Sequence, residues 1–224
     1  MHLLKKGFSK GKKYINFLPI TFSKYADYIK KTTELDAFLV TVAPIDQFGF
    51  FNFGLNGDYT IELARHAKKL IVEVNENLPR TSGQTMLHIS EVDHVIEFTA
   101  PLLEEPSLAV SDIDRQIGKY IVPLIPDGST IQMGIGGVPN AVCEQLTDKK
   151  DLGIHTEVFT SGMMDLIKKG VVNNRRKTLH QYCNVFTFAI GDREVYDFID
   201  NNPSMLCFPL SYTNEPAVVG KIII

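Results

Sequence analysis

Residues 129–142 place a short apolar strand, a turn of glycines and the start of a helix directly after one another. The segment 129–133 (STIQM) is typical of a buried strand, and the three glycines that follow allow a tight turn with exposed N–H groups. Pro139 favours the first turn of a helix. This unit is typical of α/β domains. The unpaired backbone N–H groups at the N-terminus of its helix can bind an anion.

The same glycine turn has a purely structural interpretation. It matches neither the GxGxxG pattern of dinucleotide sites nor a Walker A loop, and no Lys-Ser or Lys-Thr pair follows it. The sequence therefore does not predict ATP or GTP binding. A simple connection from strand to helix and an anion site both remain open on this pattern alone.

Composition excludes several classes of protein. The chain has 224 residues, of which 44% are hydrophobic and 22% charged, enough for one large core or two smaller ones. A net charge of −3 with mixed signs predicts no nucleic-acid partner. The apolar runs fall short of the roughly 20 residues of a membrane helix, and residues 1–13 lack the apolar centre of a signal peptide. We expect a soluble, cytoplasmic protein without a membrane partner.

The three cysteines, Cys143, Cys183 and Cys207, are an odd number without CxxC spacing. They predict neither a disulfide framework nor a zinc site, and reduced thiols in the core are the simplest interpretation. We therefore expect no metal.

Helix and strand patterns alternate along the chain, which predicts an α/β fold. Strands are expected at 37–43, 70–74, within 88–98, at 129–133 and at 184–190, and helices at 58–69 and 111–124. Residues 99–110 contain two prolines and no regular period, as in an interdomain linker. The predicted organisation is a first α/β domain at 1–98, a linker at 99–110 and a second α/β domain at 111–224.

Six blocks, in order, carry a family resemblance that extends over most of the chain. They are PIDQFGFFNFG, VEVNENLPRTSG, HISEVD, IGKYIVPLIPDGSTIQMGIGGVPNAV, KKDLGIHTEVFTSGMMDLIKKGVV and YDFIDNNP. Together they resemble the acetyl-CoA hydrolase/transferase family, and within it the 4-hydroxybutyrate CoA-transferases and the butyryl-CoA:acetate CoA-transferases. The resemblance implies two open α/β domains of the CoA-transferase type.

The resemblance also implies a site. In the family a glutamate of the IHTE block forms a glutamyl-CoA thioester, and Glu157 occupies that position. The glycine turn upstream binds the CoA thioester, which corresponds here to Gly134, Ile135, Gly136, Gly137 and Val138. The implied partners are acyl-CoA and short-chain carboxylates. Coenzyme A is then a substrate, and no permanently bound cofactor is expected.

Several residues keep two interpretations. Asn75, Pro79 and Arg80 either shape a substrate pocket or serve the backbone geometry of a turn. His155 fits a packed core histidine better than a catalytic one, and residues 163–164 (MM) fit a helix that faces the core. The run 175–177 (RRK) is expected to be a solvated turn, with contact to CoA phosphates as the alternative.

The chain departs from the family pattern in two respects. Ser161 stands where family members usually have an acidic residue. The chain also begins and ends inside the family pattern, so both domains are expected to be truncated, and the missing part includes a further glycine-rich loop. We therefore expect a homo-oligomer or association with a complementary chain.

Three functions follow as hypotheses. The first is a CoA-transferase that moves CoA between an acyl-CoA such as acetyl-CoA and a short acid such as 4-hydroxybutyrate or butyrate. The second is an acyl-CoA hydrolase, in which water replaces the acceptor acid. The third is a catalytically incomplete fragment that acts as part of an assembly.

Overall fold

The first sheet is all-parallel, and two of its three strands contribute to a buried face. The computed structural model describes residues 17–105 and 107–222. Strands β1 (Phe38–Val42), β3 (Leu70–Val74) and β6 (His94–Glu97) lie in the order β1-β3-β6. The inner face of β1 and β3 packs a core that includes Val42 and Val72, whereas Leu39 on β1 is 68% exposed and all four residues of β6 are exposed. Parallel sheets normally have both faces covered, so the outer face of this sheet is unusual.

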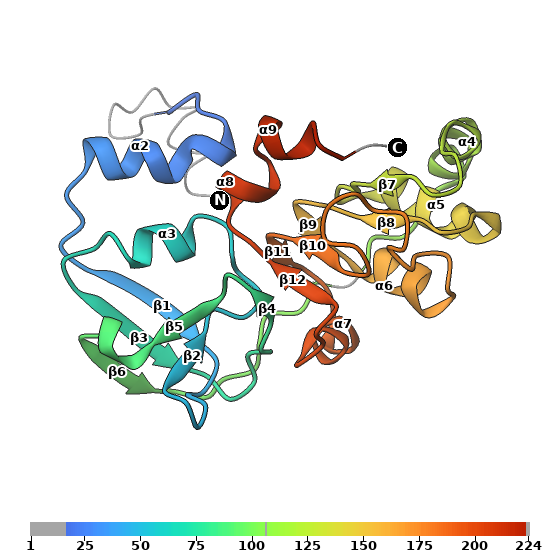
Figure 1. The fold of residues 1–224 in the computed structure, drawn as a ribbon. Coiled ribbons are helices and arrows are strands. Elements are labelled where there is room, and N and C mark those ends of the chain that lie inside the picture. The colour runs from blue at the N-terminus through green and yellow to red at the C-terminus, as the bar shows by residue number, and fades with distance from the viewer. Residues whose placement is uncertain (1–16, 106, 223–224) are drawn as a thin grey trace, which may run out of the picture.

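Helices and an antiparallel pair complete this part of the molecule (Figure 1). They are η1 (Phe22–Lys24), α2 (Tyr25–Thr32), β2 (Phe50–Asn52), α3 (Thr60–Ala64), β5 (Met86–His88) and η2 (Ile89–Glu91), with β2 antiparallel to β5. Helix α3 is shorter than the helix predicted at 58–69. After Ala64 the His66 N–H donates to the Leu63 carbonyl (3.1 Å) in a tighter turn, and the Lys68 N–H donates to the Leu35 carbonyl (2.9 Å), so the helix does not continue to residue 69.

The second part contains short parallel strands with helices beside them (Figure 1). Its strands are β7 (Thr130–Ile131), β8 (Gly153–Ile154), β9 (Val158–Phe159), β10 (Asn184–Phe186), β11 (Phe188–Ala189) and β12 (Met205–Cys207). Its helices are α4 (Asp112–Ile121), η3 (Val122–Leu124), α5 (Gly137–Gln145), η4 (Leu146–Asp148), α6 (Ser161–Lys168), α7 (Arg193–Ile199), α8 (Leu210–Thr213) and α9 (Pro216–Val219). The predicted α/β fold is confirmed.

Two sequence expectations in this part are confirmed, and a third differs from the structure. The helix expected at 111–124 is α4 followed by η3, and the Ser111 side chain caps α4 by accepting from the Asp114 N–H. Met163 and Met164 are buried in the core, as predicted. The strand expected at 184–190 is instead divided into β10 and β11, with Thr187 between them.

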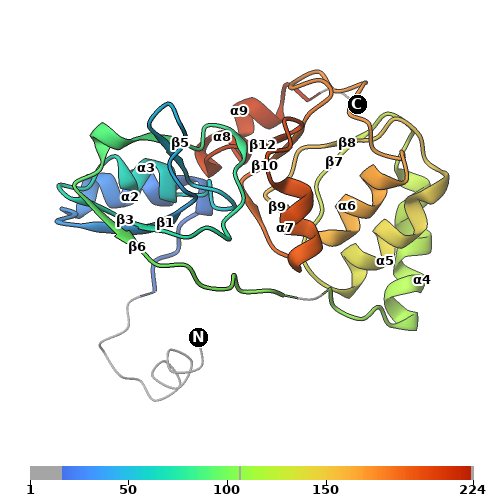
Figure 2. The same cartoon turned by 90° about the horizontal axis from the view of Figure 1, so that it is seen from below.

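Residues 99–110 form neither helix nor strand where the structure describes them, and Figure 2 shows this segment running extended between the two parts. Two hydrogen bonds nevertheless attach this segment to the second part of the molecule. The Glu105 N–H donates to the Gly191 carbonyl (2.9 Å), and the Tyr196 hydroxyl donates to the Leu103 carbonyl (2.8 Å). The division into domains at this segment stays a prediction.

A strand from the first part of the chain joins the second sheet. Strand β4 (Ser82–Gly83) pairs in parallel with β12, giving the order β10-β12-β4. Gly83 has a φ of +101°, and a Cβ there would lie 2.3 Å from the Cys207 carbonyl oxygen. Only glycine fits this position without displacing the backbone of β12.

The three cysteines are free, and the expectation of core thiols is met for Cys143 and Cys207 but not for Cys183, which is only partly buried. Cys143 and Cys207 are buried, and burial raises the pKa of the Cys143 thiol to about 12. Within 17–105 and 107–222, no helix combines the length and apolar character needed to cross a bilayer.

We predict that Gly83→Ala destabilises the protein more than Gly170→Ala. Both glycines have positive φ, but a Cβ at Gly170 meets open space. Gly170→Ala should therefore cost only the conformational strain of about 1 kcal/mol, whereas Gly83→Ala should add about 1–3 kcal/mol of crowding against β12. Urea unfolding of both variants measures the difference, and equal midpoints would contradict the close approach of β4 to β12.

Candidate functional site

Two neighbouring strands are interrupted at the same level, and Glu157 lies in the interruption. Strand β8 ends at Ile154 and β9 begins at Val158, while β10 and β11 are separated by Thr187. The Glu157 carbonyl accepts hydrogen bonds from the N–H groups of Thr187 (3.1 Å) and Phe188 (3.2 Å). The backbone of Glu157 is therefore fixed by the partner strand, although Glu157 itself belongs to no strand.

The glycine turn leaves the sheet beside Glu157. Strands β7 and β8 are parallel, and the His155 N–H donates to the Ile131 carbonyl (3.2 Å). The Thr156 hydroxyl donates to the carbonyls of Met133 (3.3 Å) and Val158 (3.0 Å). The residues immediately before the glycine turn and immediately before Glu157 are thus hydrogen-bonded to each other. Ligands in open α/β sheets bind at such carboxyl ends of strands.

The glycine turn requires glycine at two positions. Gly136 precedes α5 with a φ of +137°, a conformation that side chains rarely allow. At Gly137 a Cβ would lie 2.4 Å from Asp114 Oδ2 on α4. A Cβ at Gly134 would meet only Pro139, at 3.9 Å, so the space beside this part of the turn is open.

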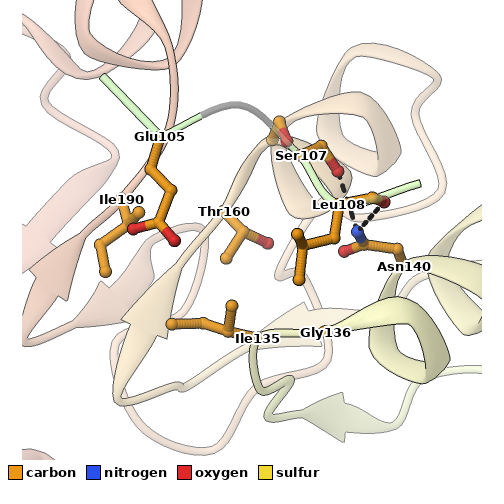
Figure 3. A pocket seen from close by; sticks show the side chains of 9 residues that line it. Glu105, Ser107, Leu108, Ile135, Gly136, Asn140, Thr160 and Ile190 are labelled. Atoms are coloured by element: carbon orange, nitrogen blue, oxygen red, sulfur yellow. Dashed lines mark hydrogen bonds between the residues drawn. The ribbon is translucent and has the colours of Figure 1, made fainter. Parts of the chain in front are cut away.

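A pocket opens over the N-terminus of α5 (Figure 3). It is lined by Glu105, Ser107, Leu108, Ile135, Gly136, Asn140, Thr160, Ser161 and Ile190. The Asn140 amide closes one side, because it donates to the Ser107 hydroxyl and the Leu108 carbonyl, both at 2.9 Å. Glu157 does not line this pocket, but Thr160 follows it three residues later and does.

The Glu157 side chain is held from the opposite end of the chain. The Asn214 amide, just after α8, donates to Glu157 Oε2, and the carboxylate is partly buried. The preceding residue, Thr213, accepts a hydrogen bond from His155 Nε2 (2.9 Å). Residues 213 and 214 therefore bind two residues of the strand interruption, His155 and Glu157.

His155 is 4% exposed, as expected for a packed histidine. Burial lowers the pKa of its imidazole, so the neutral form is favoured. Because Nε2 donates to a carbonyl, Nδ1 carries the lone pair. Among the described residues, neither this Nδ1 nor Asn214 Oδ1 has a hydrogen-bond partner, although both atoms are buried.

Comparison with known proteins identifies the family. Residues 4–103 match the acetyl-CoA hydrolase/transferase N-terminal domain. The chain is 41% identical over 207 residues to 4-hydroxybutyrate coenzyme A transferase of Clostridium kluyveri, covering 92% of this chain and 48% of that protein. It is 40% identical over 220 residues to succinyl-CoA:cyclohexane-1-carboxylate CoA transferase of Geobacter metallireducens, covering 98% of this chain and 50% of that protein. The chain belongs to the acetyl-CoA hydrolase/transferase family.

Solved structures agree with this assignment. RipA from Yersinia pestis superposes with a TM-score of 0.93 at 40% identity, over 99% of this chain and 52% of that one. A 4-hydroxybutyrate CoA-transferase from Porphyromonas gingivalis gives a TM-score of 0.88 at 38% identity, over 96% and 55% of the two chains. The fold is therefore of the CoA-transferase type, and this chain spans about half the length of the family members it matches.

The polar side chains of Asn75 and Arg80, two of the predicted substrate-pocket residues, are engaged in contacts within the protein. The Asn75 side chain donates to the Ala100 carbonyl and accepts from the Asn77 N–H, both at 3.0 Å. The Arg80 guanidinium donates to the Pro44 carbonyl (2.6 Å) and pairs with Asp46 (3.0 Å). Pro79, between them, is buried. Their role in a pocket stays a prediction.

The expectation of a solvated turn at residues 175–177 is wrong for Lys177. The side chains of Arg175 and Arg176 are 61% and 55% exposed and pair with Asp151, but Lys177 is only 5% exposed. Its ammonium donates to the carbonyls of Ile154 (2.7 Å) and Cys183 (2.6 Å). Burial lowers the pKa of Lys177 to about 8.

Sequence reasoning missed Asn214 and the burial of Lys177. Asn214 lies in the segment SYTNEP, which contains no motif, and its contact with Glu157 spans 57 positions of the chain. Lys177 follows two exposed arginines, so its local pattern indicated a surface. The contact of Asn214 with Glu157 joins segments 57 residues apart and that of Lys177 with Ile154 joins segments 23 residues apart, and no local pattern encodes either contact.

We predict that the stability difference between the wild type and Lys177→Met depends on pH above about 8. The folded pKa of about 8 lies below the ordinary value of 10.5, so between these values the unfolded chain binds more protons. The free energy of unfolding of the wild type should therefore rise relative to that of the variant as the pH increases from about 8 to 10.5. Urea unfolding at a series of pH values measures the difference. A constant difference would show that Lys177 titrates normally.

Proposed function

We propose that this chain carries the catalytic glutamate of a CoA-transferase, which moves CoA between an acyl-CoA and a short-chain carboxylate. The observation that carries the proposal is the position of Glu157 in a strand interruption, with the Asn214 amide on its carboxylate and the glycine turn on the neighbouring strand. Family membership supports it, because the named relatives are CoA transferases.

The proposed reaction is nucleophilic catalysis in ping-pong order. The Glu157 carboxylate attacks the acyl-CoA carbonyl, and departure of CoA as a thiolate leaves a mixed anhydride between the acyl group and Glu157. The thiolate then attacks the glutamyl carbonyl, which releases the donor acid and leaves CoA as a thioester on Glu157. The acceptor carboxylate attacks this thioester, and the released thiolate completes the transfer by attacking the acyl carbonyl of the new anhydride.

The backbone of the glycine turn serves this chemistry in the proposal. Each step passes through a tetrahedral oxyanion, and a preorganised N–H donor can stabilise it by about 3–4 kcal/mol. The candidates are the amides of Gly136 and Gly137, within a CoA-binding segment formed by Gly134, Ile135, Gly136, Gly137 and Val138. Asn214 fixes one carboxylate oxygen of Glu157 and thereby orients the other.

The named relatives support a carboxylate acceptor without selecting one. Their names include 4-hydroxybutyrate and cyclohexane-1-carboxylate, which share a carboxylate and differ in the attached group. We propose acyl-CoA and short-chain acids as the partners, CoA as substrate without a permanent cofactor, and a cytoplasmic enzyme. We also propose association with a second copy of this chain or with a complementary chain.

Hydrolysis is the second candidate, because the family description includes acetyl-CoA hydrolases. The same glutamyl-CoA thioester would then react with water instead of an acid. Product analysis with and without an acceptor acid separates the two activities: a transferase forms a new acyl-CoA, whereas a hydrolase forms free CoA at the same rate in both reactions.

We predict that acetyl-CoA without an acceptor adds the mass of CoA to the peptide that contains residues 153–166. Borohydride should reduce the thioester and inactivate the protein. Glu157→Gln should keep its fold and acetyl-CoA binding but form no adduct, because an amide is a far poorer nucleophile. Mass spectrometry of the digested protein measures the adduct. An unmodified peptide in protein that binds acetyl-CoA would contradict the mechanism, and an absence of binding would contradict the proposal for this chain.

We predict that Gly136→Val weakens acetyl-CoA binding about tenfold or more, because a branched side chain cannot adopt the φ of +137° and would block the open turn. Gly170→Val is the matched control. Gly170 also has positive φ, but it lies after α6 and faces open space. Isothermal titration with acetyl-CoA measures both variants, and similar affinities would remove the glycine turn from the CoA site.

A further inference from the structure

Strand β8 lacks a continuous backbone partner on the side that faces β10. On this side the Leu152 carbonyl accepts from the N–H groups of Asn173 and Asn174 (both 3.1 Å), and the Thr156 N–H donates to the Val185 carbonyl (2.9 Å). Between these two points, Ile154 has no strand opposite its backbone groups.

Side chains bind both backbone groups of Ile154. Its N–H donates to Asn174 Oδ1 (2.9 Å), and its carbonyl accepts from Lys177 Nζ (2.7 Å). Lys177 Nζ also donates to the Cys183 carbonyl at 2.6 Å, directly before β10. A side-chain amide and an ammonium thus replace the pair of backbone hydrogen bonds that a neighbouring strand would form with Ile154.

The surroundings show that Lys177 serves this contact rather than an ion pair. Within the described residues no carboxylate lies at ion-pair distance from its Nζ, although the side chain is 5% exposed. A buried charge without a carboxylate is costly, so its hydrogen bonds to carbonyls have to offset the desolvation. The stem of Lys177 lies against Gly153, where a Cβ would be 2.5 Å from Lys177 Cγ.

We propose that Lys177, with Asn174, is a positioning residue for Glu157. The two side chains fix the peptide groups on either side of Ile154, and the rigid connection through residues 155 and 156 then sets the backbone of Glu157. This inference rests on the proposed role of Glu157 as the nucleophile. An ammonium suits the role because its three N–H donors can reach carbonyls on two segments at once.

The test compares Lys177→Met with Lys169→Met in the full chain. Lys169 is an exposed lysine at the end of α6, so its variant controls for loss of a positive charge. Three quantities are measured: acetyl-CoA affinity, the rate of glutamyl-CoA formation at saturating acetyl-CoA, and amide hydrogen exchange of residues 154–157. Thermal unfolding sets an assay temperature at which each variant is folded.

Lys177→Met should bind acetyl-CoA within about twofold of the wild type but form the adduct about 100-fold more slowly, since misplacement by about 1 Å costs a factor of this size. Exchange at residues 154–157 should be faster. Lys169→Met should match the wild type in all three measurements. A wild-type rate of adduct formation in Lys177→Met would overturn the proposal.

Two further variants keep the test decisive if Lys177→Met does not fold. Gly153→Ala displaces the Lys177 stem but retains its amine, and it should slow adduct formation in the same direction. Lys177→Arg retains donors for both carbonyls and should restore part of the rate, which a loss of packing alone would not predict. Wild-type rates in Gly153→Ala, or no recovery in Lys177→Arg, would count against positioning.

Failure of the proposed function gives a different result. If the wild type binds acetyl-CoA without forming an adduct, Glu157 is not the nucleophile, and the rate comparison no longer applies. Amide hydrogen exchange of residues 154–157 is then the measurement that tests whether Lys177 positions this backbone. Faster exchange at residues 154–157 in a variant of Lys177 would support its control of this backbone, and unchanged exchange would overturn it.

Discussion

The Glu157 carbonyl, which accepts from two successive N–H groups, is the contact on which the candidate site depends. One oxygen takes the hydrogen bonds of both Thr187 and Phe188, so β8–β9 and β10–β11 remain aligned although each is interrupted. A continuous strand would alternate its side chains strictly between the two faces. The interruption frees Glu157 from this alternation while the sheet keeps its backbone in place, so a mobile loop is not needed to present the carboxylate.

The contacts of Ile154, three residues before Glu157, show how polar side chains can take the place of a neighbouring strand. Backbone groups inside a protein need partners, and where the ladder between β8 and β10 is incomplete, Asn174 and Lys177 supply them. The protein accepts a buried ammonium in exchange for complete pairing at Ile154. Asn174 is itself in a left-handed conformation, with a φ of +57°, which asparagine tolerates better than most residues. The strained Asn174 and the buried ammonium of Lys177 therefore bind the same residue, Ile154, which lies three residues before Glu157.

The parts of the fold that were predictable from the sequence are those set by neighbouring residues. The strand, glycine turn and helix at 129–142 follow from the freedom of Gly136 and the preference of Pro139. Strand β3 occupies its predicted range because four of its five residues are aliphatic and three of these are β-branched. The interruption at Thr187 was not predictable, because the apolar pattern continues through it and its cause is a carbonyl thirty residues earlier in the chain. The contact between Asn214 and Glu157 has the same character: no short-range pattern encodes an interaction between distant segments. The family resemblance, rather than periodicity, identified Glu157.

The pairing of β4 with β12 has a consequence for the order in which the chain folds. Ser82 and Gly83 are synthesised long before residues 205–207, yet these two segments form one ladder. Contacts between segments so far apart in sequence raise the contact order, and the entropy of closing the long loop has to be overcome before the pairing contributes any stability. During synthesis on the ribosome, the first sheet can assemble from its own strands β1, β3 and β6. Strand β4 stays unpaired until β12 has been synthesised. This joint between early and late parts of the chain therefore forms as one of the last steps, and until it forms the backbone of β4 offers an unpaired edge to other chains.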